Sequence, residues 1–176
     1  MLTLVLGGQR SGKSRYAENI ARLAHKAVVY VATARILDAE MQERIAPHRQ
    51  RRPVDWILVE EPIFITSLLE QYNSKDYCVL IDCLGMWLCN LFESTLDHWR
   101  QHFAELRAQF LNQLGQSRCD VIIVSPETGL GIVPAAKSSR LYLDEMGQLN
   151  QDLAGIADNV QFILAGLPLK LKGEGI

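Results

Sequence analysis

Residues 7–14 have the pattern that a nucleoside triphosphate site requires. They read Gly-Gly-Gln-Arg-Ser-Gly-Lys-Ser and fit G-x-x-x-x-G-K-[ST] without a gap. The glycines let the backbone turn so that its N–H groups face phosphate oxygens, and the lysine adds a positive charge for the β- and γ-phosphates. The serine hydroxyl is a Mg²⁺ ligand in such loops. The predicted nucleotide contacts are Gly7, Gly8, Gln9, Arg10, Ser11, Gly12, Lys13 and Ser14, and Ser14 is also a predicted metal ligand.

Asp82 is a candidate for the acid that such a site needs beside its metal ion. It ends the apolar run 78–81, and an acid in this place is typical of a Mg²⁺-binding strand. A structural alternative is that Asp82 caps a helix beginning near Leu84. We favour the metal role, because a phosphate loop without such an acid would be incomplete. Glu127 stands at the same predicted edge and is either a substrate contact or an ordinary loop residue.

A basic segment at 44–53 contains four arginines and His48. The simpler interpretation is a solvated run of charge, and composition alone favours it. The second interpretation is a nucleophile among phosphate-binding groups: a neutral imidazole can attack an α-phosphate, and flanking guanidinium groups can neutralise the oxyanions. The residue types alone leave both interpretations open.

The elements that must position these residues alternate along the chain. Short apolar runs, most without alternation, predict strands buried on both faces. They cover residues 2–6, 27–32, 56–59, 77–81, 121–124 and 160–164. Patterns with helical spacing lie between them, at 17–24, at 96–114 with Ser94 as N-cap, and at 149–156. The sequence therefore predicts an α/β fold of the phosphate-loop NTPase type, with a mostly parallel sheet flanked by helices.

The length of 176 residues fits a single domain, which we expect to span 1–171. Within it we expect an inserted basic helix and loop at about 38–62, outside the sheet, and a frayed tail at 172–176. A net charge of −2 argues against a general nucleic-acid binder. No apolar run is long enough for a membrane span, and the four cysteines have no paired spacing. We therefore expect a cytoplasmic protein with reduced thiols.

The order of these motifs resembles that of one known family. The matching segments are 6–14, 29–34, 38–45, 48–53, 80–84 and 129–134. The phosphate loop alone is common to a large superfamily, whereas R-I-x-x-H-R at 44–49 together with G-x-G-I-V-P at 129–134 is specific. The sequence resembles the bifunctional adenosylcobinamide kinase/adenosylcobinamide-phosphate guanylyltransferases of cobalamin biosynthesis.

This resemblance implies a transferase with two steps. ATP or GTP would phosphorylate the aminopropanol hydroxyl of adenosylcobinamide. GTP would then guanylylate a histidine with release of pyrophosphate, and the phosphorylated corrinoid would take the GMP to give adenosylcobinamide-GDP. The family's histidine falls on His48, and Lys13 is the second expected catalytic residue. Further nucleotide contacts would be Ala32, Thr33, Ala34, Arg49, Gln50, Arg51, Arg52, Glu60 and Asp82. The implied cofactor is Mg²⁺, held by Ser14 and Asp82, and the implied assembly is a homo-oligomer such as a trimer.

Three positions depart from the pattern that is common in this family. Leu143 stands in place of an arginine, Pro126 in place of an asparagine and Gly85 in place of a threonine. If the arginine holds the corrinoid phosphate or assists phosphoryl transfer, the kinase half-reaction would be weaker in this chain. The residues implied for guanylylation are intact.

Two other functions fit part of the sequence. A kinase with a single activity would need the phosphate loop and Asp82 but would have no use for His48. A GTP-binding switch would account for the D-x-x-G pattern at 82–85, but no N-K-x-D motif follows it. A nucleic-acid-dependent ATPase is opposed by the net charge.

Overall fold

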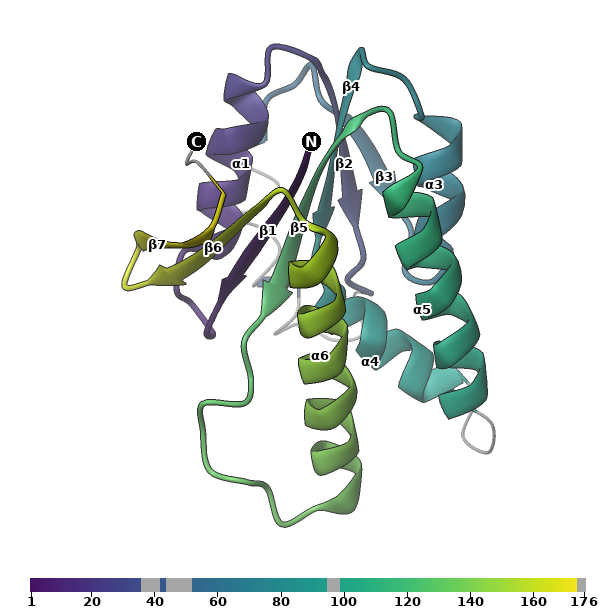
Figure 1. Cartoon of the computed structure of the whole chain (residues 1–176), viewed down its shortest axis with the longest axis vertical. Coiled ribbons are helices and arrows are strands. Elements are labelled where there is room, and N and C mark those ends of the chain that lie inside the picture. Colours follow the sequence, from purple (N-terminus) through teal and green to yellow (C-terminus); the bar gives the residue numbers. More distant parts are fainter. Residues whose placement is uncertain (36–41, 44–51, 95–98, 174–176) are drawn as a thin grey trace.

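The computed structural model describes residues 1–35, 42–43, 52–94 and 99–173. Its centre is a seven-stranded sheet with the order β3-β2-β4-β5-β1-β6-β7 (Figure 1). All neighbouring strands run parallel except β6 and β7, which are antiparallel. The strands are β1 (Leu2–Gly7), β2 (Ala27–Ala32), β3 (Ile57–Glu60), β4 (Tyr77–Asp82), β5 (Asp120–Pro126), β6 (Asn159–Leu164) and β7 (Leu167–Lys172).

Helices cover both faces of this sheet, which confirms the predicted α/β architecture. They are α1 (Lys13–Leu23), α3 (Ile65–Gln71), α4 (Leu84–Ser94), α5 (Trp99–Gly115) and α6 (Lys137–Ile156). Successive side chains of a strand point to opposite faces of the sheet, and each face has its own hydrophobic cluster. In β1, Leu4 and Leu6 pack with α3–α6, whereas Val5 packs with α1. Because both faces of the central strands are covered, residues of either parity are apolar in β1, β2, β4 and β5. All six predicted runs are strands, although β3 is largely exposed.

The larger of the two cores is centred on Trp87 of α4. This side chain is fully buried, and its ring lies 5.8 Å from the ring of Phe103 and 5.4 Å from that of Phe110, measured between centroids. Its indole N–H donates a hydrogen bond of 2.8 Å to the carbonyl of Ile63. Trp87 therefore joins α4, α5 and the loop before α3 into one layer.

Three expectations about local structure need correction. Ser94 is the last residue of α4, so it is not the N-cap of the next helix. We expected the segment at about 38–62 to lie outside the sheet, but residues 57–60 form strand β3, which pairs with β2. Lys172 is not frayed: it ends β7, and its Nζ donates to the carbonyls of Ala154 (3.0 Å) and Gly155 (2.9 Å). The rest of the predicted insertion, 36–41 and 44–51, and the tail 174–176 lie outside the described residues.

Helix α3 lies in a stretch for which the sequence analysis predicted no element, and β7 is the strand that it missed. All six of its residues are exposed, and it forms the edge of the sheet beside β6. Its Leu-Pro-Leu-Lys-Leu-Lys sequence has no continuous apolar run because neither face is covered within this chain. No helix in the described part of the chain has both the length and the apolar character needed to cross a membrane.

We expect Trp87→Ala to lower the free energy of unfolding by about 3–5 kcal/mol, because it opens a cavity in the core and leaves the Ile63 carbonyl without its donor. Phe64→Ala is the matched control, since this ring is 61% exposed. Its effect should stay within about 0.5 kcal/mol. Urea unfolding followed by circular dichroism measures both values. Equal losses in the two variants would contradict the assigned core.

Candidate functional site

The phosphate loop joins β1 to α1 at the carboxyl edge of the parallel sheet (Figure 1). Gly12 is the N-cap of α1 and has a φ of 95°, a left-handed conformation that favours glycine. Lys13 begins the helix, and its Nζ donates a hydrogen bond of 3.0 Å across the loop to the carbonyl of Gly8. The helix amino terminus and the lysine thus meet at one point, which suits a polyphosphate.

Contacts on both sides leave little room inside this loop. A Cβ at Gly7 would lie 2.5 Å from the Ser11 Oγ and 2.7 Å from the Ile163 carbonyl oxygen, so only glycine fits there. The N–H of Gly166, in the turn between β6 and β7, donates to the Ser11 carbonyl at 2.9 Å. The β6–β7 hairpin therefore supports the loop from the side opposite β5.

The structure brings Ser14 and Asp82 together, as the sequence analysis expected. The Ser14 hydroxyl donates to Oδ1 of Asp82 at 3.2 Å. The hydroxyl of Tyr30 donates to the other carboxylate oxygen, Oδ2, at 2.7 Å. Both oxygens of Asp82 thus face side chains at the sheet edge, which favours the metal role over a purely structural cap.

This pair of ligands fits Mg²⁺. A hydroxyl and a carboxylate oxygen are hard donors, and Mg²⁺ in phosphate sites is held by one or two protein ligands together with waters and substrate phosphates. In the described ranges no group of three or more His, Cys, Asp or Glu side chains could hold a metal ion by itself. Ser14 and Asp82 would therefore hold Mg²⁺ only in combination with a nucleotide.

Burial raises the pKa of the Tyr30 phenol, and the neighbouring Asp82 charge raises it further. Burial and the same carboxylate also raise the pKa of the Cys83 thiol, to about 11. Neither group ionises near neutral pH, so Tyr30 stays a hydrogen-bond donor and Cys83 a neutral thiol. All four cysteines are free, in agreement with the expected reduced thiols.

Residues 32–34 follow β2 and lie beside the end of β4. Thr33 is fully buried: its Oγ1 donates to the Cys83 carbonyl at 2.8 Å and accepts from the Cys83 N–H at 2.9 Å. Asn90 of α4 donates to the Thr33 carbonyl at 2.8 Å. The Thr33 N–H also donates to the Asp82 carbonyl at 3.2 Å. These bonds connect the ends of β2 and β4, and the nucleotide contact of Thr33 stays a prediction.

The edge strand β3 brings one further predicted residue to this region. Glu60 pairs with Ala32 in the sheet, and Ala32 pairs with Asp82 on its other side. These three predicted residues consequently form one row across three strands. Ala34 is the second residue after the end of β2.

Arg52 is the one predicted residue of the basic segment that the described ranges include. Its Cζ lies 4.1 Å from the centroid of the Tyr30 ring, and its buried Nε has no hydrogen-bond partner. The ring of Trp56 stacks on Tyr30 at 6.2 Å. His48, Arg49, Gln50 and Arg51 lie outside the described residues, so their places in the site stay predictions.

Sequence reasoning missed Tyr30 and Trp56 as parts of this site. Both belong to segments that were interpreted as strands, and the sequence around a buried aromatic residue in a strand does not indicate that the ring contacts an acid.

The sequence analysis left two interpretations of Glu127 open, a substrate contact or an ordinary loop residue. Its N–H donates to the Gly7 carbonyl at 3.0 Å, and its Oε1 accepts from the Gly129 N–H at 2.6 Å. This carboxylate thus stabilises a turn beside the phosphate loop.

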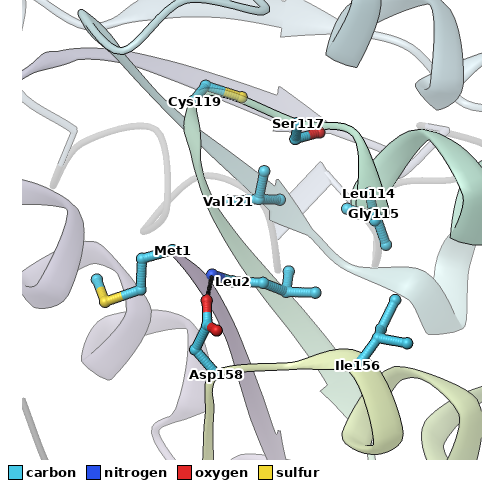
Figure 2. A pocket seen from close by; sticks show the side chains of 9 residues that line it. All are labelled: Met1, Leu2, Leu114, Gly115, Ser117, Cys119, Val121, Ile156 and Asp158. Atoms are coloured by element: carbon cyan, nitrogen blue, oxygen red, sulfur yellow. Dashed lines mark hydrogen bonds between the residues drawn. The ribbon is translucent and has the colours of Figure 1, made fainter.

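A cavity of about 190 Å³ lies at the other end of the sheet. Figure 2 shows it around the start of β1, where the N–H of Leu2 donates to Asp158 at 2.6 Å. None of the predicted site residues lines it. It is separated from the phosphate loop by the length of β1, and we assign it no part in the chemistry.

Comparisons with known proteins agree with this geometry. The family model for cobinamide kinase / cobinamide phosphate guanyltransferase matches residues 3–171. The chain is 46% identical over 174 residues to the bifunctional adenosylcobalamin biosynthesis protein CobP of Pseudomonas aeruginosa, with 99% of each chain covered. It is 36% identical over 185 residues to the bifunctional adenosylcobalamin biosynthesis protein CobU of Escherichia coli, with 98% of this chain and 100% of that one covered.

Solved structures with low sequence identity share the fold. The RadB recombinase superposes with a TM-score of 0.50 at 20% identity, over 92% of this chain and 73% of that one. A Pyrococcus horikoshii protein superposes with a TM-score of 0.57 at 10% identity, over 99% and 87%. The sequence matches extend over nearly the whole chain. The chain therefore belongs to the cobinamide kinase / cobinamide phosphate guanyltransferase family of transferases.

Proposed function

We propose that this chain phosphorylates adenosylcobinamide and then transfers GMP from GTP to the product through a guanylyl-histidine at His48. Family membership supports the pair of reactions. The observation that carries the proposal is that the phosphate loop, Asp82 and the end of the basic segment meet at one edge of the sheet.

In the kinase step, the aminopropanol oxygen attacks the γ-phosphorus of ATP or GTP. The bond from that phosphorus to the β,γ-bridging oxygen breaks, the nucleoside diphosphate leaves, and the hydroxyl proton passes to solvent. Lys13 and the backbone N–H groups of the loop hold the phosphates in line. Mg²⁺, when bound by Ser14 and Asp82, supplies charge neutralisation on the β- and γ-oxygens.

In the guanylyl step, a neutral His48 nitrogen attacks the α-phosphorus of GTP. A P–N bond forms, the bond from the α-phosphorus to the α,β-bridging oxygen breaks, and pyrophosphate leaves. A phosphate oxygen of adenosylcobinamide phosphate then attacks the same phosphorus, and the P–N bond breaks to regenerate the imidazole. Arg49, Arg51 and Arg52 would neutralise the oxyanions in both displacements.

The position of Arg52 supports the role of His48. Arg52 lies over the Tyr30 ring, and the Tyr30 hydroxyl binds Asp82. Four residues of chain span at most roughly 14 Å, so position 48 lies within that distance of this anchor.

Two departures from the common family pattern are coupled in the fold. A Cβ at Gly85 would lie 2.7 Å from the Cγ of Pro126 and 3.0 Å from the Tyr142 hydroxyl. A threonine at 85 therefore does not fit beside a proline at 126. The two changes are a packing adjustment near the site, and they do not by themselves remove a phosphate contact.

The edge strand β7 supports the proposed homo-oligomer. Leu167, Leu169 and Leu171 are each more than half exposed on a strand with a free edge, and such edges are usually covered in native proteins. We propose a cytoplasmic homo-oligomer, such as a trimer, that covers this strand.

Leu169→Lys should then lower the mass measured by sedimentation equilibrium to that of the monomer, because it places a charge on the proposed contact. An unchanged mass would exclude β7 from the contact.

His48→Ala should abolish the protein-bound label that forms with Mg²⁺ and α-labelled GTP, because no imidazole remains to form the P–N bond. Acid lability and alkaline stability of the adduct identify a phosphoramidate. Lys13→Ala is the comparison variant, and it should impair both half-reactions because both need a positioned triphosphate. Label that persists in His48→Ala would exclude this nucleophile, and kinase activity without any adduct in the parent protein would identify a single-activity kinase.

Gly85→Ala should cost about 1–3 kcal/mol of unfolding free energy, because the new methyl group overlaps Pro126. Adding Pro126→Ala should recover most of this loss, which gives a coupling energy of about 1 kcal/mol or more. Gly147→Ala in α6 is the matched control, since a Cβ added there would meet no atom within 4 Å and helix propensity should make the change neutral or stabilising. Urea unfolding of the parent, Gly85→Ala, Pro126→Ala, their double variant and Gly147→Ala measures these values. Additive effects of the two single substitutions would contradict the coupling.

A further inference from the structure

We propose that Tyr30 is the positioning residue that connects the metal site to the basic segment: its hydroxyl orients the Asp82 carboxylate, and its ring orients Arg52. This inference rests on the proposed function for the role of Arg52, but its metal-site half does not depend on turnover. Tyr30 lies in β2 between β3 and β4, pairs with Leu58 and Leu80, and is 3% exposed.

The first half of the proposal concerns the carboxylate. Asp82 receives the Tyr30 hydroxyl on Oδ2 at 2.7 Å and the Ser14 hydroxyl on Oδ1 at 3.2 Å. Two donors on different oxygens fix the rotation of the carboxyl group about its Cβ–Cγ bond. When Ser14 turns its lone pairs to Mg²⁺, the Tyr30 bond still holds Oδ2. This bond would thereby keep the Asp82 carboxylate in the orientation that it has beside Ser14.

The second half concerns the guanidinium group. Arg52 lies with its Cζ 4.1 Å from the Tyr30 centroid, a distance at which a cation is attracted to an aromatic ring. Trp56 stacks on the same ring at 6.2 Å, and Arg22 of α1 lies over Trp56 at 5.9 Å. This stack leaves the ring little freedom to move. The buried Nε of Arg52 has no hydrogen-bond partner, so it is a donor that a phosphate oxygen can satisfy.

The two halves are separable by substitution. Tyr30→Phe removes the hydroxyl and keeps the ring, whereas Tyr30→Leu removes both. Arg52→Gln removes the cation and keeps the contact between Tyr30 and Asp82. Tyr77→Phe is the matched control, because Tyr77 lies at the far end of β4 and packs edge-on against Tyr72.

The metal-site half is tested by equilibrium binding of a fluorescent, non-hydrolysable GTP analogue at increasing Mg²⁺. We expect Tyr30→Phe to raise the half-saturating Mg²⁺ concentration roughly tenfold, the effect of losing one hydrogen bond to a charged group. Binding in EDTA should be the same for this variant, Tyr77→Phe and the parent. An unchanged Mg²⁺ dependence in Tyr30→Phe would overturn this half of the proposal.

The second half of the proposal, that the Tyr30 ring orients Arg52 (the ring half), is tested by the rate of adduct formation from α-labelled GTP at saturating Mg²⁺. Arg52→Gln should slow this rate with an unchanged half-saturating Mg²⁺ concentration, and Tyr30→Leu should be slower than Tyr30→Phe by roughly fivefold. Equal rates in the Phe and Leu variants, or a normal rate in Arg52→Gln, would overturn it. If Tyr30→Leu fails to fold in a melting experiment, Arg52→Gln decides alone.

These outcomes separate the inference from the proposed function. A parent protein that forms no adduct refutes the guanylyl-histidine and with it the ring half, since Arg52 would then have no transfer to assist. The Mg²⁺ titration still decides the metal-site half in that case.

Discussion

The hydrogen bond between Ser14 and Asp82 is the contact on which the site depends. The two residues follow β1 and end β4, and β5 lies between these strands in the sheet. The contact exists because α1 begins at the loop and packs over that face of the sheet, with Ala17, Ile20 and Ala21 buried against it. The proposed phosphate site and its proposed metal ligand thus depend on how α1 packs against the sheet. The carboxyl ends of the strands, where the order of connection reverses, are where α/β sheets bind ligands.

Neighbouring elements stabilise this arrangement from three directions. The turn of the β6–β7 hairpin binds the loop through Gly166 and Ser11. Tyr30 binds Asp82 from β2, and Thr33 joins the ends of β2 and β4. Tyr30 and Thr33 are both buried, so the contacts at Asp82 and at the end of β4 come from the interior of the protein. The residues proposed to hold phosphate and metal are therefore fixed by contacts among described residues, whereas His48, which we propose carries the transfer, lies outside them.

Local signals in the sequence were sufficient for the phosphate loop and for six strands. A loop whose chemistry needs glycine at 7 and 12 is visible from residue types, and strands covered on both faces are visible as apolar runs. Strand β7 was missed because its exposed faces produce alternation instead of a run. Ser94 was misassigned because a serine before an amphipathic pattern can equally end the preceding helix. Tyr30 contacts Asp82, and a Cβ added at Gly85 would overlap Pro126. Both pairs join residues far apart in the sequence, so no local pattern could predict them.

A crystal structure of the protein with GTP and Mg²⁺ tests the account most directly. We predict phosphate groups on the loop at Lys13, one metal ion between Ser14 and Asp82, and a guanylate whose phosphorus is bonded to a ring nitrogen of His48. Tyr30 should still contact Asp82, with Arg52 over its ring. A triphosphate bound away from the loop, or a guanylate attached to a residue other than His48, would contradict it.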